Sequence, residues 1–201
     1  MTSGSACPSV ADEKTMPFDA YLAAAARPRQ SYTHWPWTSL EEQAASSPCS
    51  ERGVVALVTD AGKGEVAPGL SMVVQVVLQK GSTSPHRHSF WHIYVVKSGA
   101  GKCCLDDGIV QPLASGDVLF VPAWETHGFE NASEDQPLVL LALQNLPQLA
   151  GMGALMRDSG AGEITHVYRA ASASGEAVVQ AFASRELCHG RAVHPNAKEA
   201  L

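Results

Sequence analysis

The sequence predicts an all-β domain, a sandwich or a barrel, for the central part of the chain, residues 53–146. Short runs rich in β-branched residues recur there at spacings of about 8–12 residues, which is typical of antiparallel all-β folds. Turn sequences separate the runs, and one of them contains Asp107-Gly108, a strong signal for a β-hairpin. The expected strands are Val54–Val58, Met72–Leu78, Ile93–Val96, Val118–Val121 and Leu138–Leu143.

The strand expected at Met72–Leu78 is apolar on both of its faces. Valines occupy both its even-numbered and its odd-numbered positions, and only Gln75 interrupts them. A strand with this pattern is covered by protein on both sides. We expect the aromatic segment Tyr32–Trp37 to cover part of the outer face. A second copy of the chain, in a homodimer, is expected to cover the rest.

The two flanking segments give weaker patterns. Residues 18–26 are rich in Ala and Leu, which favour a short helix, and Pro28 is expected to end it. In the C-terminal part, Ile164–Tyr168 and Ala177–Phe182 fit either strands or short helices, and periodicity does not decide between them.

Three parts of the chain are therefore expected. Residues 1–30 form an N-terminal segment with a short helix, residues 31–150 form the β-barrel, and residues 151–201 form a poorly defined C-terminal extension.

The bulk composition excludes several classes of function. The chain has 201 residues, of which 17% are charged, and its formal net charge is −6. An acidic chain without a cluster of Lys and Arg is a poor candidate for binding nucleic acid or anionic membranes. No apolar run is long enough to span a membrane, and the first residues do not look like a secretory signal. The five cysteines form neither a disulfide framework nor a CxxC metal site, so we expect a cytoplasmic protein with reduced thiols.

Four of the eight histidines form a pattern that predicts a metal site. His86 and His88 lie two residues apart, so on a strand they point to the same face and can converge on one ion. His92 has the same parity but lies about 20 Å from His86 along a straight strand. It can join the site only if the chain folds back near residues 89–91 and places it on the neighbouring strand. His127 follows Pro122 and is expected to start a strand opposite the first pair.

These residues resemble the two motifs of the cupin family. Gly81, His86-x-His88, position 92 and Gly99 have the spacing of the first motif. The second motif is matched by Gly116, Pro122, His127 and Asn131. The sequence departs from the family at two positions: His92 replaces the usual Glu ligand, and Trp124 replaces a Gly. The resemblance implies a single double-stranded β-helix, or jelly-roll, barrel that binds one divalent metal.

Residues 35–147 also resemble the N-terminal half of gentisate 1,2-dioxygenase and its hydroxybenzoate relatives. The matching pieces are Trp35-Pro36-Trp37 with Leu40, Glu51-Arg52, His86-Arg87-His88-Ser89, Gly116-Asp117, Pro122-Ala123-Trp124, His127 and Leu146-Pro147. The resemblance implies an Fe(II) site, held by His86, His88 and His127, that cleaves an aromatic ring with O₂. The family has two cupin halves where this chain has one, no ligand where His92 stands, and an acidic residue at the position of Ala142.

The identity of the metal is not decided by the ligands. Imidazole suits Fe, Ni, Cu and Zn, and Mn is also possible. Only the resemblance favours Fe(II). Four neutral ligands would leave the full charge on the ion, which would make it a strong Lewis acid.

Strand parity also suggests which residues line the pocket. Tyr94 shares the face of His92, Trp124 lies on a turn beside His127, and Gln75 and Gln144 are polar residues in otherwise apolar strands. We name Tyr94, Gln75 and Trp124 as candidate catalytic residues. Packing in the core, or an internal hydrogen bond, explains each of them equally well. Arg87 points away from the two histidines beside it and is expected to be structural.

Three hypotheses about function follow. The first is an Fe(II) dioxygenase that acts with O₂ on a small aromatic, hydroxybenzoate-like substrate or on another metal-chelating molecule. The second is a non-redox Zn or Ni enzyme, a cyclase, isomerase or lyase, because a four-histidine site resembles the zinc site of some polyketide-cyclase cupins. The third is a small-molecule-binding protein without catalysis.

Overall fold

The structure is a computed structural model that describes residues 15–26, 30–47, 55–59, 64–160, 164–170 and 178–184. It divides into two units, Met1–Tyr32 and Thr33–Leu201. The first unit contains the predicted short helix, α1 (Phe18–Ala25), whose apolar side chains are all exposed. Within the described part of the chain, no helix has the length and apolar character needed to cross a membrane.

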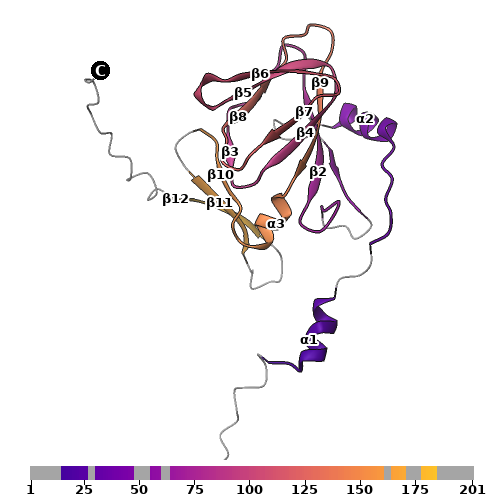
Figure 1. Cartoon of the computed structure of the whole chain (residues 1–201), viewed down its shortest axis with the longest axis vertical. Helices are drawn as coiled ribbons and strands as arrows, with labels where there is room; N and C mark the ends of the chain where they lie inside the picture. Colours follow the sequence, from indigo (N-terminus) through magenta and orange to yellow (C-terminus); the bar gives the residue numbers. More distant parts are fainter. Residues whose placement is uncertain are drawn as a thin grey trace, which may run out of the picture. The chain divides into compact units, whose positions relative to one another are not determined.

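The second unit is mostly β-structure, as predicted, and its described strands form three sheets (Figure 1). The first sheet has the order β1-β2-β9-β4-β7, the second β6-β5-β8 and the third β12-β11-β10-β3. The strands of the first sheet are β1 (Val55–Leu57), β2 (Ser71–Val77), β4 (His92–Ser98), β7 (Val118–Val121) and β9 (Leu138–Gln144). Those of the second are β5 (Ala100–Leu105), β6 (Val110–Ala114) and β8 (His127–Glu130). Those of the third are β3 (Arg87–His88), β10 (Met156–Asp158), β11 (Ile164–Ala170) and β12 (Val178–Ser184).

The five strands predicted from sequence correspond to the five strands of the first sheet. Val54 of the first of these strands lies outside the described residues, as does Ala177 of the segment Ala177–Phe182. The pattern did not predict β5 and β6, which carry Gly101, Lys102 and Pro112, residues that are uncommon in strands. Hydrogen bonds join the described strands into three sheets and do not close them into one barrel, which refines the predicted architecture.

The main core lies between the first and second sheets. It contains Tyr94 and Val96 from β4, Cys103 from β5, Phe129 from β8 and Leu140 from β9, each with at most 2% of its surface exposed. These positions follow the period-two alternation that a strand imposes on its side chains. The inward face of the first sheet therefore carries the even-numbered residues of β4 and β9.

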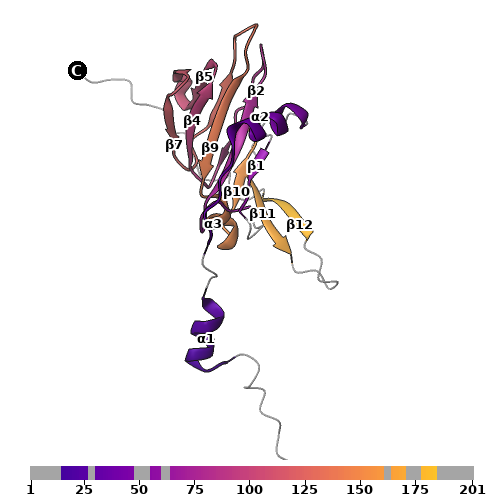
Figure 2. The same cartoon turned by 90° about the vertical axis from the view of Figure 1, so that its right-hand side faces the viewer.

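The outer face of the first sheet is covered by a helix that the sequence did not predict, α2 (Trp37–Ser46). Leu40 of α2 is buried against Leu57 and Val74, and Trp35 and Trp37 pack on the same cluster. Figure 2 shows α2 beside β2 and β1. Trp35 and Trp37 of the aromatic segment therefore cover part of this face, as predicted, whereas Tyr32 is exposed. The chain enters α2 directly after Pro36, a residue that fits the first turn of a helix because it needs no amide partner there.

Part of the C-terminal segment lies within the described residues, and that part contains regular structure. A short helix, α3 (Leu146–Gly151), follows β9, and β10 then pairs antiparallel with β3, with Asp158 opposite Arg87 and Arg157 opposite His88. The two segments whose type was left open are both strands, β11 and β12, and they pair with each other. Strand β10 is thus hydrogen-bonded to the strand that carries His88.

Candidate metal centre

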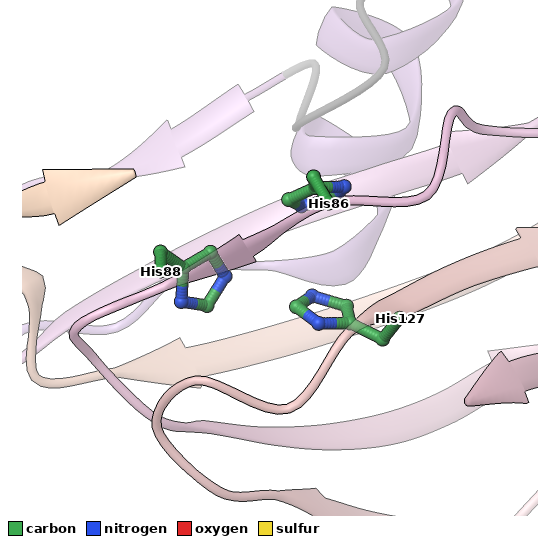
Figure 3. A group of neighbouring side chains, drawn as sticks. All are labelled: His86, His88 and His127. Carbon is green, nitrogen blue, oxygen red and sulfur yellow. The ribbon is translucent and has the colours of Figure 1, made fainter. Parts of the chain in front are cut away.

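Three histidines meet between the sheets. The ligand atoms of His86, His88 and His127 all lie within 4.8 Å of one another, and Figure 3 shows their rings turned toward a common space. His86 and His127 form an antiparallel bridge with two backbone hydrogen bonds, of 3.1 and 2.9 Å. His127 therefore begins β8, as predicted, and lies directly across this bridge from His86. His88 follows two residues later, on β3.

Each of these three rings is held by a backbone carbonyl two residues away in the sequence. A carbonyl oxygen only accepts hydrogen bonds, so the Nδ1 of each ring must carry the proton and donate. The Nε2 lone pair of each ring is then directed to a possible ligand. The three pairs are His86 with Ser84 (2.9 Å), His88 with Phe90 (2.7 Å) and His127 with Glu125 (3.0 Å). In metal-binding histidines, an acceptor at the ring nitrogen that does not bind the metal fixes the tautomer and the orientation of the ring.

Burial keeps His88 and His127 neutral, which is the form that binds metals. Burial, with a smaller effect of the nearby His127, lowers the pKa of His88 from 6.5 to about 3. Burial also lowers the pKa of His127 to about 4, although its hydrogen bond to the Glu125 carbonyl opposes the shift. Protons therefore do not compete for the Nε2 atoms of His88 and His127 near neutral pH.

His92 lies next to the group but is not one of its three members. The chain bends at residues 89–91, as predicted, and the Nε2 of His92 comes within 3.0 Å of the Nε2 of His88. The prediction that His92 lies on the neighbouring strand was wrong. His92 begins β4 in the first sheet, whereas β3 pairs with β10 in the third.

The donor set fits a divalent metal. Protein imidazoles bind such ions at about 2.0–2.1 Å, so two Nε2 atoms 3.0 Å apart can share one ion. Burial lowers the pKa of His92 to about 2, so this ring is neutral as well. Its buried Nδ1 has no hydrogen-bond partner. Neutral nitrogen ligands suit Fe, Ni, Cu and Zn alike.

The three candidate catalytic residues lie in different positions. The Tyr94 hydroxyl is 3.3 Å from the Nε2 of His127, and its ring stacks on His92. Burial raises the pKa of Tyr94 well above its usual value, so the hydroxyl keeps its proton. Trp124 adopts a left-handed backbone with φ 65°, and its amide donates to the carbonyl of His88 at 2.8 Å.

Gln75 faces inward but lies further from the histidines. It pairs with Leu140, which in turn pairs with Val96, two rows along the sheet from His92. The other polar residue of the strands, Gln144, pairs directly with His92. Of the two glutamines named from the sequence, Gln144 is the one beside the histidine group.

Residues that the sequence analysis missed hold the histidine strand in place. The Ser89 hydroxyl donates to the carbonyl of Ala154 at 2.8 Å and accepts from the amide of Met156 at 2.9 Å. Arg87, expected to be structural, contacts the Asp158 carboxylate through Nε and Nη2 at 3.0 and 2.9 Å. No spacing in the sequence links Asp158 to the histidines, because the contact depends on how β10 returns to β3.

A small cavity of about 230 Å³ opens beside His86. Its lining residues are Pro85, His86, Arg87, Thr126, Asp158 and Gly160. Because Asp158 pairs with Arg87, the described lining offers little net charge to attract an anion.

Comparisons with known proteins agree with this arrangement. Residues 73–143 match the cupin domain family. The chain is 29% identical over 126 residues to a 5-aminosalicylate 1,2-dioxygenase from a Comamonas species. That alignment covers 59% of this chain and 33% of the relative, so the chain spans about a third of that protein's length.

Solved structures show the same fold. A salicylate 1,2-dioxygenase from Pseudaminobacter salicylatoxidans superimposes with a TM-score of 0.63 at 23% identity, over 74% of this chain and 46% of that one. A structure of that dioxygenase with gentisate gives a TM-score of 0.60 at 21% identity, over 72% and 43% of the two chains. This chain therefore has the cupin fold, and it is similar to proteins named as salicylate and aminosalicylate dioxygenases.

Proposed function

We propose that this chain is a metal-dependent cupin enzyme, an Fe(II) dioxygenase that acts with O₂ on a small hydroxybenzoate-like or other chelating substrate. The observation that carries the proposal is the convergence of the ligand atoms of His86, His88 and His127, of which His88 and His127 are buried and neutral. The relatives named as salicylate and aminosalicylate dioxygenases support the choice of chemistry.

In this proposal His86, His88 and His127 hold the metal, and His92 is a fourth ligand. A bound Fe(II) would supply the redox chemistry needed to use O₂ on a chelating substrate. The chain's own groups prepare the site. Three backbone carbonyls fix the rings, and the Tyr94 hydroxyl lies where it can hold a proton close to His127.

The pocket residues are proposed from their positions. The Tyr94 hydroxyl contacts His127 directly, and the Trp124 amide connects the turn after β7 to the strand of His88. Gln75 lies on β2, in the same sheet as Tyr94 but further from the histidines. Ala142 pairs with Tyr94 at the position where the gentisate dioxygenases have an acidic residue. We therefore propose a hydroxybenzoate-like substrate class without naming gentisate itself.

A non-redox Zn or Ni enzyme is the second candidate, and the position of His92 favours it. If the fourth ligand is a neutral imidazole, no protein ligand offsets the charge of the ion, and its strength as a Lewis acid increases.

O₂ consumption distinguishes the two proposals. Protein purified without oxygen and loaded with Fe(II) is mixed with salicylate, gentisate or 5-aminosalicylate, and dissolved O₂ is recorded. With at least one of these substrates, we expect one molecule of O₂ to be consumed for each molecule of substrate. His127→Ala should abolish the uptake. Absence of uptake with every hydroxybenzoate, in protein that does hold iron, would contradict the dioxygenase proposal.

Three further features remain proposals. We propose a homodimer, a cytoplasmic location, and the division of the chain into residues 1–30, 31–150 and 151–201.

A further inference from the structure

A row of three buried polar residues crosses the first sheet next to the histidine group. Ser71 of β2 pairs with Gln144 of β9, and Gln144 pairs with His92 of β4. The exposed fractions of the three residues are 6%, 8% and 6%. Because paired residues on adjacent strands point to the same face, the three side chains lie side by side.

The rows further inward on this face are mostly apolar, apart from the Tyr94 hydroxyl and Gln75. The next row inward contains Val73, Ala142 and Tyr94, and the row after that contains only Leu140 and Val96 beside Gln75. The polar row also lies at the end of the sheet where His92 reaches His88. It therefore borders the space into which the metal-binding Nε2 atoms point.

Two atoms of the row have no protein partner. The Ser71 Oγ and the His92 Nδ1 are both buried without a hydrogen bond. Buried polar groups are nearly always satisfied, so an unpartnered one needs a reason. Two in the same row beside a candidate metal site point to a partner that is not part of the protein.

We propose that Ser71, Gln144 and His92 form a polar subsite that binds a hydrogen-bonding substituent of the substrate. This inference rests on the proposed function, because the substrate's chelating groups are taken to lie at the histidines. From His92 to Ser71, the row extends across two strand spacings, about 9–10 Å, away from the other histidines. A hydroxyl or amino group on the far side of an aromatic ring would meet this row. The subsite would then select substrates that carry such a group over those that lack it.

The first test compares three ligands that differ only at that substituent. Gentisate and 5-aminosalicylate carry a hydroxyl or an amino group at ring position 5, and salicylate carries hydrogen there. Dissociation constants are measured without oxygen on the Fe(II)-loaded full chain. We expect the wild type to bind at least one substituted ligand more tightly than salicylate. The ratio should fall by up to roughly tenfold in Ser71→Ala and Gln144→Leu, as expected for the loss of one hydrogen bond.

Matched controls are available on the exposed surface. Ser98→Ala, at the end of β4, and Gln111→Leu, on β6, make the same chemical changes at exposed positions. Both controls should keep the wild-type ratio. An unchanged ratio in Ser71→Ala and Gln144→Leu, or no preference in the wild type, would overturn the subsite.

The second test needs no ligand. If the Ser71 hydroxyl serves a ligand and not the fold, removing it should leave the Tm of the metal-free protein unchanged or raise it. A clear drop in Tm for Ser71→Ala, relative to Ser98→Ala, would show that the row is structural and would overturn the inference. Should the wild type hold iron but bind none of the three ligands, the proposed substrate class fails. This Tm comparison then decides whether the row serves a ligand.

Discussion

Trp124 departs from the cupin pattern at a position where the backbone conformation favours glycine. Its φ of 65° lies in the left-handed region, where a side chain costs about 1–2 kcal/mol and glycine costs little. The family has glycine at this position. Here the Trp124 amide donates to the carbonyl of His88, so the strained turn is connected to the histidine strand.

The buried histidines predict a loss of stability in acid. The folded-state pKa values of His88, His92 and His127, about 3, 2 and 4, lie below the ordinary value of 6.5. Between pH 6.5 and about 4 the unfolded chain binds protons that the folded chain does not. As the pH is lowered through this range, the free energy of unfolding should therefore decrease by up to about 1.4 kcal/mol per pH unit for each histidine.

Denaturant titrations of the metal-free protein between pH 7 and pH 4 measure this slope. His88→Leu should reduce it, because this variant removes one of the buried rings. Equal stability of the wild type at pH 7 and pH 4 would contradict the assignment of these rings as neutral and buried.

His92 is expected to contribute to the metal site without being essential. In His92→Ala three histidines remain, so the metal should be retained with an affinity lower by roughly 10–100-fold. His92→Glu should keep the metal and lower the Fe(III)/Fe(II) potential, because a carboxylate neutralises part of the charge. Competition with a chelator measures affinity, and electrochemistry measures the potential. Identical affinities and potentials in all three proteins would show that His92 is not a ligand.

The sequence pattern was most informative where spacing alone determines geometry. His86 and His88 share a face because they are two residues apart, and the bend that brings His92 to His88 was required by their separation. The pairing of His127 with His86 was not predictable, because it depends on how β8 meets residues 82–86. Ser71 gave no signal, since a serine at the start of an apolar strand is unremarkable.

At the scale of elements, strand β10 pairs with β3 and stabilises its position. The Arg87–Asp158 pair and the two hydrogen bonds of Ser89 fasten it to the residues that flank His88. Asp158 is 6% exposed, and its other oxygen accepts from the amide of Gly160 at 2.8 Å. The glycine-rich sequence before β10 gave no sign of this attachment, because the attachment depends on contacts distant in sequence.

Removing the Asp158 charge tests this attachment. Asp158→Asn should lower the free energy of unfolding by about 1.5–3 kcal/mol, the usual contribution of a hydrogen bond to a charged group. Chemical denaturation measures the change. Glu134→Gln breaks the Lys80–Glu134 pair, which is also 2.9 Å long but exposed on both sides, and should have almost no effect. Equal effects of the two variants would show that β10 does not stabilise the fold through Asp158.

At the scale of the whole molecule, part of the first sheet lacks a cover among the described residues. On the edge strand β7, Val118 and Phe120 are 67% and 59% exposed, and Val95 on β4 beside them is 37% exposed. No charged residue or proline lies within β7 to prevent edge-to-edge pairing, as natural edges usually require. This edge is where we place the proposed homodimer contact.

Sedimentation measures the dimer directly. The wild type should be a dimer at micromolar concentration, and Phe120→Asp should be a monomer because it places a charge in the apolar contact. Ile109→Asp changes a residue of similar exposure, 56%, on the β5–β6 hairpin and should remain dimeric. A monomeric wild type would rule out the homodimer.

The central claim is that His86, His88 and His127 bind one metal ion per chain. Metal analysis of protein purified without oxygen tests it most directly, with His127→Ala and His34→Ala purified in the same way. We predict one equivalent of metal in the wild type and in His34→Ala, and almost none in folded His127→Ala. A near-normal metal content in His127→Ala, with circular dichroism showing an intact fold, would contradict the account.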